Sequence, residues 1–330
     1  MKLKTGLGLA FGIVLIAWIF SRYHIGDAAA FLARADTLYL IPLPLFFAAS
    51  YVTRAARWKV LFDKTDRPRI GTLLRSLMVG HMMNNFLPAR AGDVARIYLL
   101  GQRAVISKSI VLATVVLEKV GDLIITACLI SVVLVSLPAS AWIRSAGYAL
   151  GMSSLAGVLV ILLVPIFGME MLTLLRRYLH FLPHAVYERL LTIAENLITG
   201  IRSGTKVRGL VYFAAYSIVI WAMEILVMMF IAKSLDIQLG LIPSLFVMLT
   251  IAVGAMIPAA PGSLGTFEYF SLTALALVGI DGSAALAFTV LYHAVLLLGT
   301  TLGGLFFLVL PGRQKLLELL KRGDAARQDV

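Results

Sequence analysis

The sequence predicts an all-α polytopic membrane protein with about six full spans and two broken or re-entrant helical hairpins. Three observations support this fold class. Of the 330 residues, 60% are hydrophobic and only 14% are charged, whereas a soluble protein carries roughly a quarter charged residues. Several apolar stretches reach the roughly 20 residues that a spanning helix needs. Two other apolar stretches are interrupted by similar segments that contain Pro and Gly.

The two interruptions follow one pattern. Residues 87–93 read Leu-Pro-Ala-Arg-Ala-Gly-Asp, and residues 257–263 read Ile-Pro-Ala-Ala-Pro-Gly-Ser. Pro removes a helical hydrogen-bond donor and Gly permits a tight turn, so each segment breaks its helix. Broken backbone at membrane depth persists only where protein or a water-filled cavity satisfies its polar groups, and a matched pair points to a transporter binding site. We expect the hairpin tips at Pro88, Gly92, Pro258 and Gly262.

Six uninterrupted stretches are predicted to cross the bilayer: 5–21, 38–56, 110–136, 147–167, 209–232 and 284–310. The first follows two lysines but lacks a small-x-small cleavage site, so it is predicted to be an uncleaved span. The broken hairpins occupy 72–106 and 242–280. The alternative is eight full spans. Re-entrance is favoured because the arm after Gly92 is short and carries Arg96 and Arg103.

Basic residues predict the orientation of the spans. With both termini cytoplasmic, 23 Lys and Arg residues fall in cytoplasmic pieces and 4 in outside loops, as the positive-inside rule requires. The hairpins then enter from opposite sides, which makes 72–136 and 242–310 inverted repeats. We expect one integral membrane domain over 1–330. Its cytoplasmic parts would include a loop at 168–208, amphipathic near 187–201, and a tail at 311–330.

Several functional classes lack their motifs. The sequence has no G-x-x-x-x-G-K-[ST] loop and no H-E-x-x-H, and Cys128 is its single cysteine. An ATPase or a metal enzyme is therefore not expected, and neither are a cofactor or a metal site. The basic residues behind the net charge of +12 lie beside apolar segments. In that position they set the orientation of the spans and attract lipid headgroups, so they do not indicate nucleic acid binding.

Ionisable residues at membrane depth are costly and are therefore candidates for function. Around the first break lie Asn84, Asn85, Arg90, Asp93 and Arg96. In one interpretation they only hold the hairpin together: the Asn side chains satisfy freed backbone groups, and Asp93 neutralises an Arg. In the other they line a polar cavity in which Arg90 grips a phosphate, because a planar guanidinium suits that group.

A second polar group interrupts the span at 110–136. Glu118 and Asp122 are one helical turn apart and share a face, with Lys119 between them. These carboxylates could pair structurally or take up a proton during transport. We also expect them to balance the charge of Arg90 when the site is empty.

Other polar residues are assigned simpler roles. Arg54, Arg57, Trp58 and Lys59 end the second span, where we expect an interfacial anchor. Glu224 lies within the fifth span and Glu268 follows the second break. His293, in the last span, is predicted to be a hydrogen-bonded packing residue.

Three motifs resemble the lysylphosphatidylglycerol synthase transmembrane-region family, the flippase-like domain of the multiple peptide resistance factor, which also occurs alone. They are Asn85-x-Leu87-Pro88-x-Arg90-x-Gly92-Asp93-x-x-Arg96, Glu118-Lys119-x-x-Asp122 and Pro258-x-x-Pro261-Gly262-x-x-Gly265-x-x-Glu268. The resemblance covers nearly the whole chain. It places the following residues in the family's polar core: Arg90, Asp93, Arg96, Glu118, Asp122, Pro261, Gly262 and Glu268.

The chain departs from that family at two positions. The family usually has Arg where this chain has Lys119, and Arg where it has His293. Lys keeps the charge but loses the bidentate grip of Arg, so headgroup preference is expected to differ. The fused relatives carry an aminoacyl-transferase domain that these 330 residues do not include, so lysyl transfer is not expected of this chain.

Taken together, the residues and the resemblance predict an inner-membrane lipid transporter of the flippase type. It would move a phospholipid or a polyprenyl-type lipid phosphate without ATP, in a bacterial or archaeal cytoplasmic membrane. Its partners would be membrane phospholipids or lipid-linked intermediates, and a lipid-modifying enzyme in addition. One alternative is a membrane transferase acting on a lipid-linked substrate, with Asp93 or Glu118 as base. Another is a scaffold for a lipid-synthesis enzyme.

Overall fold

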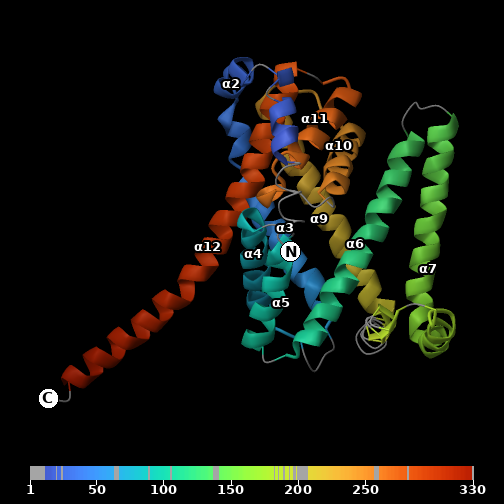
Figure 1. The fold of residues 1–330 in the computed structure, drawn as a ribbon. Helices are drawn as coiled ribbons and strands as arrows, with labels where there is room; N and C mark the ends of the chain where they lie inside the picture. Colours follow the sequence, from blue (N-terminus) through green and yellow to red (C-terminus); the bar gives the residue numbers. More distant parts are fainter. Residues whose placement is uncertain are drawn as a thin grey trace.

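The structure is a computed structural model that describes residues 12–19, 21–23, 25–62, 67–87, 90–104, 106–136, 141–181, 207–255, 260–280 and 282–328, with parts of 183–198. All regular structure in these residues is helical (Figure 1). The predicted all-α polytopic membrane class is therefore confirmed. The helices are α2 (Ile25–Ala33), η1 (Thr37–Leu40), α3 (Leu43–Lys59), α4 (Ile70–Phe86), α5 (Ala91–Ala104), α6 (Lys108–Ser136), α7 (Ala141–Tyr178), α9 (Val207–Ser234), α10 (Leu241–Gly254), η3 (Pro261–Ser263), α11 (Thr266–Leu277) and α12 (Gly282–Gln328).

Four helical segments in the described residues are long and apolar enough to cross a membrane. They are Thr37–Lys59, Ile110–Ser136, Gly209–Ser234 and Gly282–Val309. These segments coincide with four of the six predicted spans. The predicted span at 147–167 lies inside α7, which contains the apolar stretch Tyr148–Leu159. The predicted first span, 5–21, is described only from residue 12.

Both interrupted segments form pairs of short helices. In the first pair, α4 has 17 residues and α5 has 14. In the second pair, α10 has 14 residues and α11 has 12. At 1.5 Å per residue these helices are roughly 18–26 Å long, which is shorter than the ~30 Å hydrocarbon core. The lengths therefore favour re-entrant hairpins over the alternative of eight full spans.

The tips of the two hairpins meet inside the bundle. In Figure 1, α4 and α5 occupy the lower half of the molecule, whereas α10 and α11 occupy the upper half. The side chain of Arg90, at the first tip, donates a hydrogen bond of 2.8 Å to the carbonyl oxygen of Ala255, at the second. Gly262 lies so close to α4 that an added Cβ would be 3.5 Å from the carbonyl oxygen of Asn85. The hairpins thus enter from opposite ends and touch at their tips.

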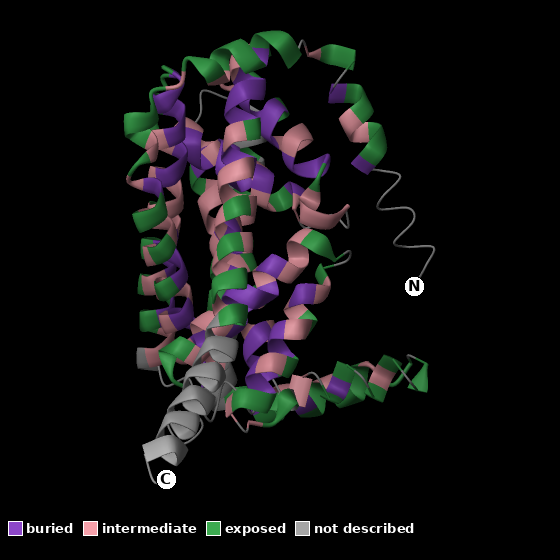
Figure 2. Ribbon diagram, turned by 90° about the vertical axis from the view of Figure 1, so that its left-hand side faces the viewer, coloured by how far each residue is buried: buried purple, intermediate pink, exposed green. Residues whose placement is uncertain are grey.

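The buried residues of the bundle (Figure 2) include two apolar clusters, one around each hairpin. Around α4 and α5, the buried residues include Trp58, Phe62 and Leu77. Around α10 and α11, they include Met228 and Phe288. Between these two cores lie the hairpin tips, where polar side chains replace apolar ones.

Three segments differ from the predicted organisation. Helix α7 continues to Tyr178, so the predicted loop at 168–208 starts about ten residues later than expected; Leu172 in that extension packs with Leu191 of the amphipathic stretch. Helix α12 continues through the residues assigned to the tail, 311–330, as far as Gln328. The segment at 22–37, which was predicted to be a loop outside the membrane, contains helix α2.

Candidate functional site

Arg57 on α3 is the centre of a buried ion-pair network. Its guanidinium donates to both carboxylate oxygens of Asp122, at 2.5 and 3.2 Å, and to the hydroxyl of Ser217 at 3.0 Å. It also lies 3.5 Å from Glu118. The Arg57 side chain is 1% exposed. Arg57 thus joins α3 to α6 and α9.

The expectation that Arg57 and Trp58 form an interfacial anchor is wrong. Trp58 is fully buried, and its indole N–H donates to the hydroxyl of Thr114 on α6. The chain does not leave the bundle at the end of α3. Leu61 and Phe62 fold back into the apolar core after the helix, so they cover the last turn that sequence reasoning placed at the membrane surface.

Glu118 connects the Arg57 pair to the first hairpin. Its second carboxylate oxygen accepts from Arg96 on α5 at 3.2 Å. Arg96 is 1% exposed, lies 3.5 Å from Asp93 one turn earlier, and stacks over the Trp58 ring at 5.0 Å. Asp93 in turn lies 3.6 Å from the ammonium of Lys119. The prediction that Glu118 and Asp122 share a helix face is confirmed, because both face Arg57.

In the described part of the chain, this network balances its charge. It contains three basic side chains, Arg57, Arg96 and Lys119, and three acidic ones. Removing one partner of a buried ion pair leaves an uncompensated charge and costs about 3–5 kcal/mol. The pairing therefore explains how so many ionised groups remain among apolar helices.

Burial falls steadily across the network. Arg57, Glu118 and Arg96 are almost inaccessible, but Asp93 is 21% exposed, Asp122 31% and Lys119 45%. Glu118 lies ten residues from the start of α6, or about 15 Å along the helix axis. The network is thus sealed around Arg57, Glu118 and Arg96, and it is partly accessible at Asp93 on α5 and at Lys119 and Asp122 on α6.

A second ion pair joins α3 to α9. Arg54 pairs with Glu224 and lies over the Tyr51 ring. Arg54 was also expected to be an interfacial anchor, and its side chain is only 22% exposed. Because it stands one turn before Arg57, α3 presents both cations to the bundle interior.

The first hairpin tip is held by its two asparagines. Asn84 accepts a hydrogen bond from the backbone N–H of Gly92 at 2.8 Å and so caps the start of α5. Asn85 donates to the hydroxyls of Thr300 and Thr301 on α12, at 2.7 and 2.9 Å. The predicted satisfaction of freed backbone groups by Asn is confirmed at Asn84. Pro88, predicted at this tip, lies outside the described residues.

Arg90 is separated from the carboxylates that we expected to balance it. In the described residues, its guanidinium donates to the carbonyl oxygen of Ala255, and no carboxylate lies within ion-pair distance. The expectation that Glu118 and Asp122 balance Arg90 is therefore wrong, because Arg57 and Arg96 already neutralise them. Arg90 is exposed and adopts a left-handed backbone conformation, with φ 54°.

The second tip is organised by Glu268 and His293. Glu268 accepts from the backbone N–H of Gly265 at 2.7 Å and lies 2.5 Å from Nδ1 of His293. Nε2 of His293 donates to the carbonyl oxygen of Gly262 at 2.9 Å, and its ring stacks on Phe267. The prediction of a hydrogen-bonded packing role for His293 is confirmed.

The predicted site residues fall into two groups that the hairpin tips connect. The first contains Arg96, Asp93, Glu118, Lys119 and Asp122, and the second contains Pro261, Gly262, Glu268 and His293. Asn85 and Arg90 lie at the junction of the tips. Pro258 lies outside the described residues.

Sequence reasoning missed Arg57, Ser217 and Arg54 as members of the polar interior. Their signal was weak, because cations at the end of a span usually lie at the interface. The i, i+3 spacing of Arg54 and Arg57, which puts both on one helix face, was the available sign.

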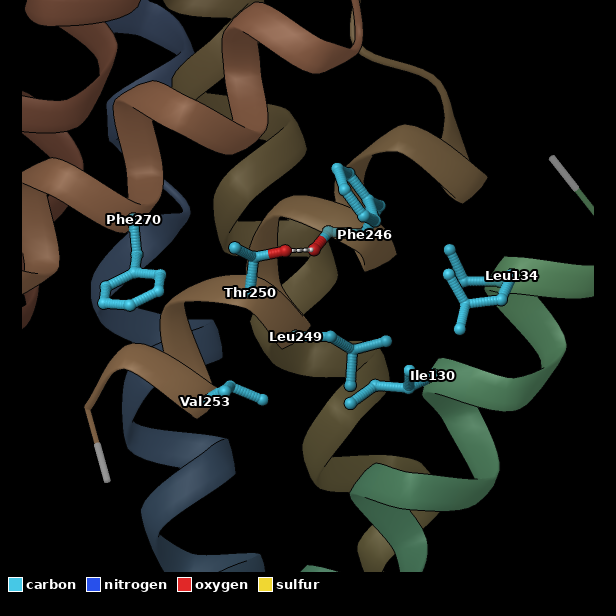
Figure 3. Close-up of a pocket in the computed structure, with 8 residues that line it drawn as sticks. Ile130, Leu134, Phe246, Leu249, Thr250, Val253 and Phe270 are labelled. Carbon is cyan, nitrogen blue, oxygen red and sulfur yellow. Dashed lines mark hydrogen bonds between the residues drawn. The ribbon is translucent and has the colours of Figure 1, made fainter. Parts of the chain in front are cut away.

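A separate apolar pocket of about 150 Å³ lies between α6 and the second hairpin (Figure 3). The single hydroxyl in its wall, that of Thr250, donates its hydrogen to the carbonyl of Phe246 and so has no hydrogen left to donate to a ligand. This pocket suits a hydrocarbon group. Its lining residues are Ile130, Val133, Leu134, Phe246, Leu249, Thr250, Val253 and Phe270.

Comparison with known proteins finds membrane relatives. A UPF0104 membrane protein of Pyrococcus horikoshii is 25% identical over 335 residues, which cover 95% of this chain and 99% of that protein. A UPF0104 membrane protein of Methanocaldococcus jannaschii is 29% identical over 229 residues, covering 69% and 94%. The glycosyltransferase AglD of Haloferax volcanii is 23% identical over 328 residues, covering 90% of this chain but only 53% of that protein. No solved structure matches the chain.

The family described as the lysylphosphatidylglycerol synthase TM region matches residues 6–304. This range contains both hairpins, the ion-pair network and the Glu268–His293 pair. The chain therefore belongs to the lysylphosphatidylglycerol synthase TM-region family.

Proposed function

We propose that the protein is a lipid transporter of the flippase type, which moves a phosphate-bearing lipid headgroup across the bilayer without ATP. One observation carries this proposal: two half-membrane hairpins touch at their tips beside a buried, charge-balanced network. Opposed broken helices of this kind surround the substrate site in many transporters. The lipid would be a membrane phospholipid or a polyprenyl-type lipid phosphate.

Two cations are suited to make the first contact with the phosphate. Arg90 is exposed, and its guanidinium donates to the carbonyl oxygen of Ala255. Lys119 is 45% exposed and shares Asp93 with Arg96. A phosphate oxygen would compete with weak partners at both positions. Arg57 and Arg96, in contrast, are held by Glu118 and Asp122 and would keep the frame fixed while the headgroup passes.

Reconstitution tests the proposed transport directly. Purified protein in liposomes should expose a fluorescent phospholipid or a polyprenyl phosphate to an impermeant quencher faster than empty liposomes do. Arg90→Ala should lower the rate at least tenfold and Arg90→Lys less, because Lys keeps the charge but not the bidentate geometry. Arg34→Ala, an exposed Arg outside the network, is the matched control. A normal rate in Arg90→Ala would remove the phosphate role from this residue.

The proposed orientation places both termini on the cytoplasmic side of a bacterial or archaeal membrane. In a Cys128→Ser background, cysteines at Ala35 and Gly240 should react with an impermeant thiol reagent added outside. Cysteines at Asp66 and Thr205 should be protected. Protection of Gly240 would mean that both hairpins open to the same side, which contradicts the opposed arrangement.

The name of the AglD relative raises a second function, transfer to a lipid-linked substrate. Only 53% of that glycosyltransferase matches this chain. A membrane transferase of this kind would need a free base, but Asp93 and Glu118 are both held in ion pairs. Turnover of a lipid-linked sugar by the purified chain would favour this function over transport.

A further inference from the structure

Both ring nitrogens of His293 lie within hydrogen-bond distance of an oxygen, one from Glu268 and one from Gly262. The carbonyl oxygen of Gly262 can only accept, so Nε2 of His293 must carry a hydrogen. Nδ1 of the same ring lies 2.5 Å from a carboxylate oxygen of Glu268. That short contact requires a second hydrogen between the two atoms, because otherwise two lone pairs would face each other. The pair therefore holds one proton more than a carboxylate beside a neutral imidazole.

We propose that the Glu268–His293 pair is a proton-binding site that couples proton movement to the second hairpin tip. This inference rests on the proposed transport function. The proton sits on Nδ1 of His293 or on Oε1 of Glu268. When the proton binds or leaves, only that N–H or O–H bond forms or breaks. It arrives from water on one side of the membrane and leaves to water on the other.

Release of the proton would act on the tip through both residues. The lone pairs of Nδ1 and Oε1 would repel each other, so the ring and the carboxylate would separate. His293 also donates to the carbonyl oxygen of Gly262. Gly262 has a left-handed φ of 66° and lies against Asn85 of the first tip. Glu268 also caps α11 through Gly265. A change in one proton would therefore loosen the contact between the hairpin tips.

Other ionisable groups on the elements packed against α12 do not compete for this proton. Within the described residues, none of them forms an ion pair with His293 or with Glu268. On α9, Glu224 is paired with Arg54 of α3. The ionisable groups meant are Asp27 on α2, Arg75 and His81 on α4, Tyr212, Tyr216, Glu224 and Lys233 on α9, and Tyr269 on α11.

Glu268→Gln removes the shared proton with little change of shape. A glutamine can accept from Gly265 N–H through its oxygen and donate to Nδ1 of a neutral His293 through its amide. All three tip contacts are then satisfied without a mobile proton. Glu195→Gln is the matched control, since Glu195 forms an exposed ion pair with Arg176 and is far from Glu268 in the sequence.

Two measurements test the proposal. In pH-difference infrared spectra of the purified protein, the wild type should show a band of the Glu268 side chain, from the protonated acid or from a shifted carboxylate, that Glu268→Gln lacks and Glu195→Gln keeps. In liposomes, an imposed pH gradient should accelerate lipid movement by the wild type and Glu195→Gln. Glu268→Gln should lose this acceleration entirely, so that its rate is the same with and without the gradient. His293→Gln, which can still donate to Gly262, should behave in the same way and serves if Glu268→Gln does not fold.

The two measurements separate failure of this proposal from failure of the transport function. A wild type that moves no lipid but shows the Glu268 band would refute transport and keep the proton site. A full gradient response in Glu268→Gln would overturn the coupling role. Identical infrared spectra of wild type and Glu268→Gln would overturn the proton site itself.

Discussion

The two hairpins solve one structural problem with different chemistry. Each must begin a helix in the middle of the membrane, where the first backbone N–H groups have no helical partner. In the first hairpin, the amide of Asn84 accepts from Gly92. In the second, the carboxylate of Glu268 accepts from Gly265. An amide keeps one chemical state at every pH, whereas a carboxylate beside an imidazole can exchange a proton.

The two hairpins also differ in the ionisable groups that hold them in place. The first hairpin is fixed by Arg96, which is locked between Asp93 and Glu118. The second is held to α12 by His293 alone among the ionisable groups described there. If the Glu268–His293 pair couples proton movement as proposed, the first hairpin is the permanent frame and the second is the movable partner. The following variants test that difference.

The largest expected loss of stability is at Arg57. Arg57→Met leaves Asp122 without its cation and Glu118 with Arg96 alone, so the free energy of unfolding should fall by about 3–5 kcal/mol. Glu268→Gln should change it by less than about 1 kcal/mol, because its hydrogen bonds can be replaced. Thermal unfolding of both variants in the same detergent measures the contrast.

Two further variants show whether Arg57 acts through its charge. Arg57→Met combined with Asp122→Asn should recover part of the loss, since one unpaired charge is removed as well. Arg176→Met, which breaks an ion pair exposed by 56% and 43%, should cost less than about 1 kcal/mol. Equal stability of Arg57→Met and Arg176→Met would refute the idea of a permanent charged frame.

A smaller effect is expected from the two tip glycines. A Cβ at Gly92 would collide with the backbone carbonyl of Gly80, so Gly92→Ala should force α4 and α5 apart and cost about 1–3 kcal/mol. Gly262→Ala should cost about 1–2 kcal/mol, because a side chain is strained at φ 66°. Gly26→Ala is the control, since nothing lies within 4 Å of its added Cβ.

Transport should respond to these two variants in the opposite order to stability. Gly262→Ala changes the tip that we regard as movable, so it should slow lipid movement more than Gly92→Ala does in equal amounts of folded protein. Equal slowing by both variants would erase the functional difference between the hairpins.

Much of the fold was predictable because it depends on local sequence. Apolar length gave the spans, and Pro and Gly marked the breaks at residues 87–93 and 257–263. The spacing of Glu118 and Asp122 placed both carboxylates on one face. Helix ends were less predictable, since tertiary packing rather than propensity decides whether α7 stops at residue 168 or continues to Tyr178.

The partners within the site could not be predicted in the same way. Arg57 meets Asp122 across 65 positions and Ser217 across 160. Charge and depth along a span show which residues need a partner but not which helix supplies it. Arg90 was therefore matched with the wrong carboxylates, and Arg57, the true partner, was assigned to the interface.

The smallest expected effect concerns the tether between the first tip and α12. Asn85 donates to Thr300 and Thr301, two turns beyond His293 on the same helix. Hydrogen bonds between membrane helices contribute about 0.6–2 kcal/mol, so Asn85→Ala should lower the free energy of unfolding by about 1 kcal/mol. Thr301→Val alone should lower it less, because Thr300 still accepts. Adding Thr301→Val to Asn85→Ala should then cause no further loss, which unfolding of the four proteins can measure as a double-mutant cycle. Additive losses would show that Asn85 and Thr301 act separately, and that the first hairpin is held at its tip by packing rather than by this tether.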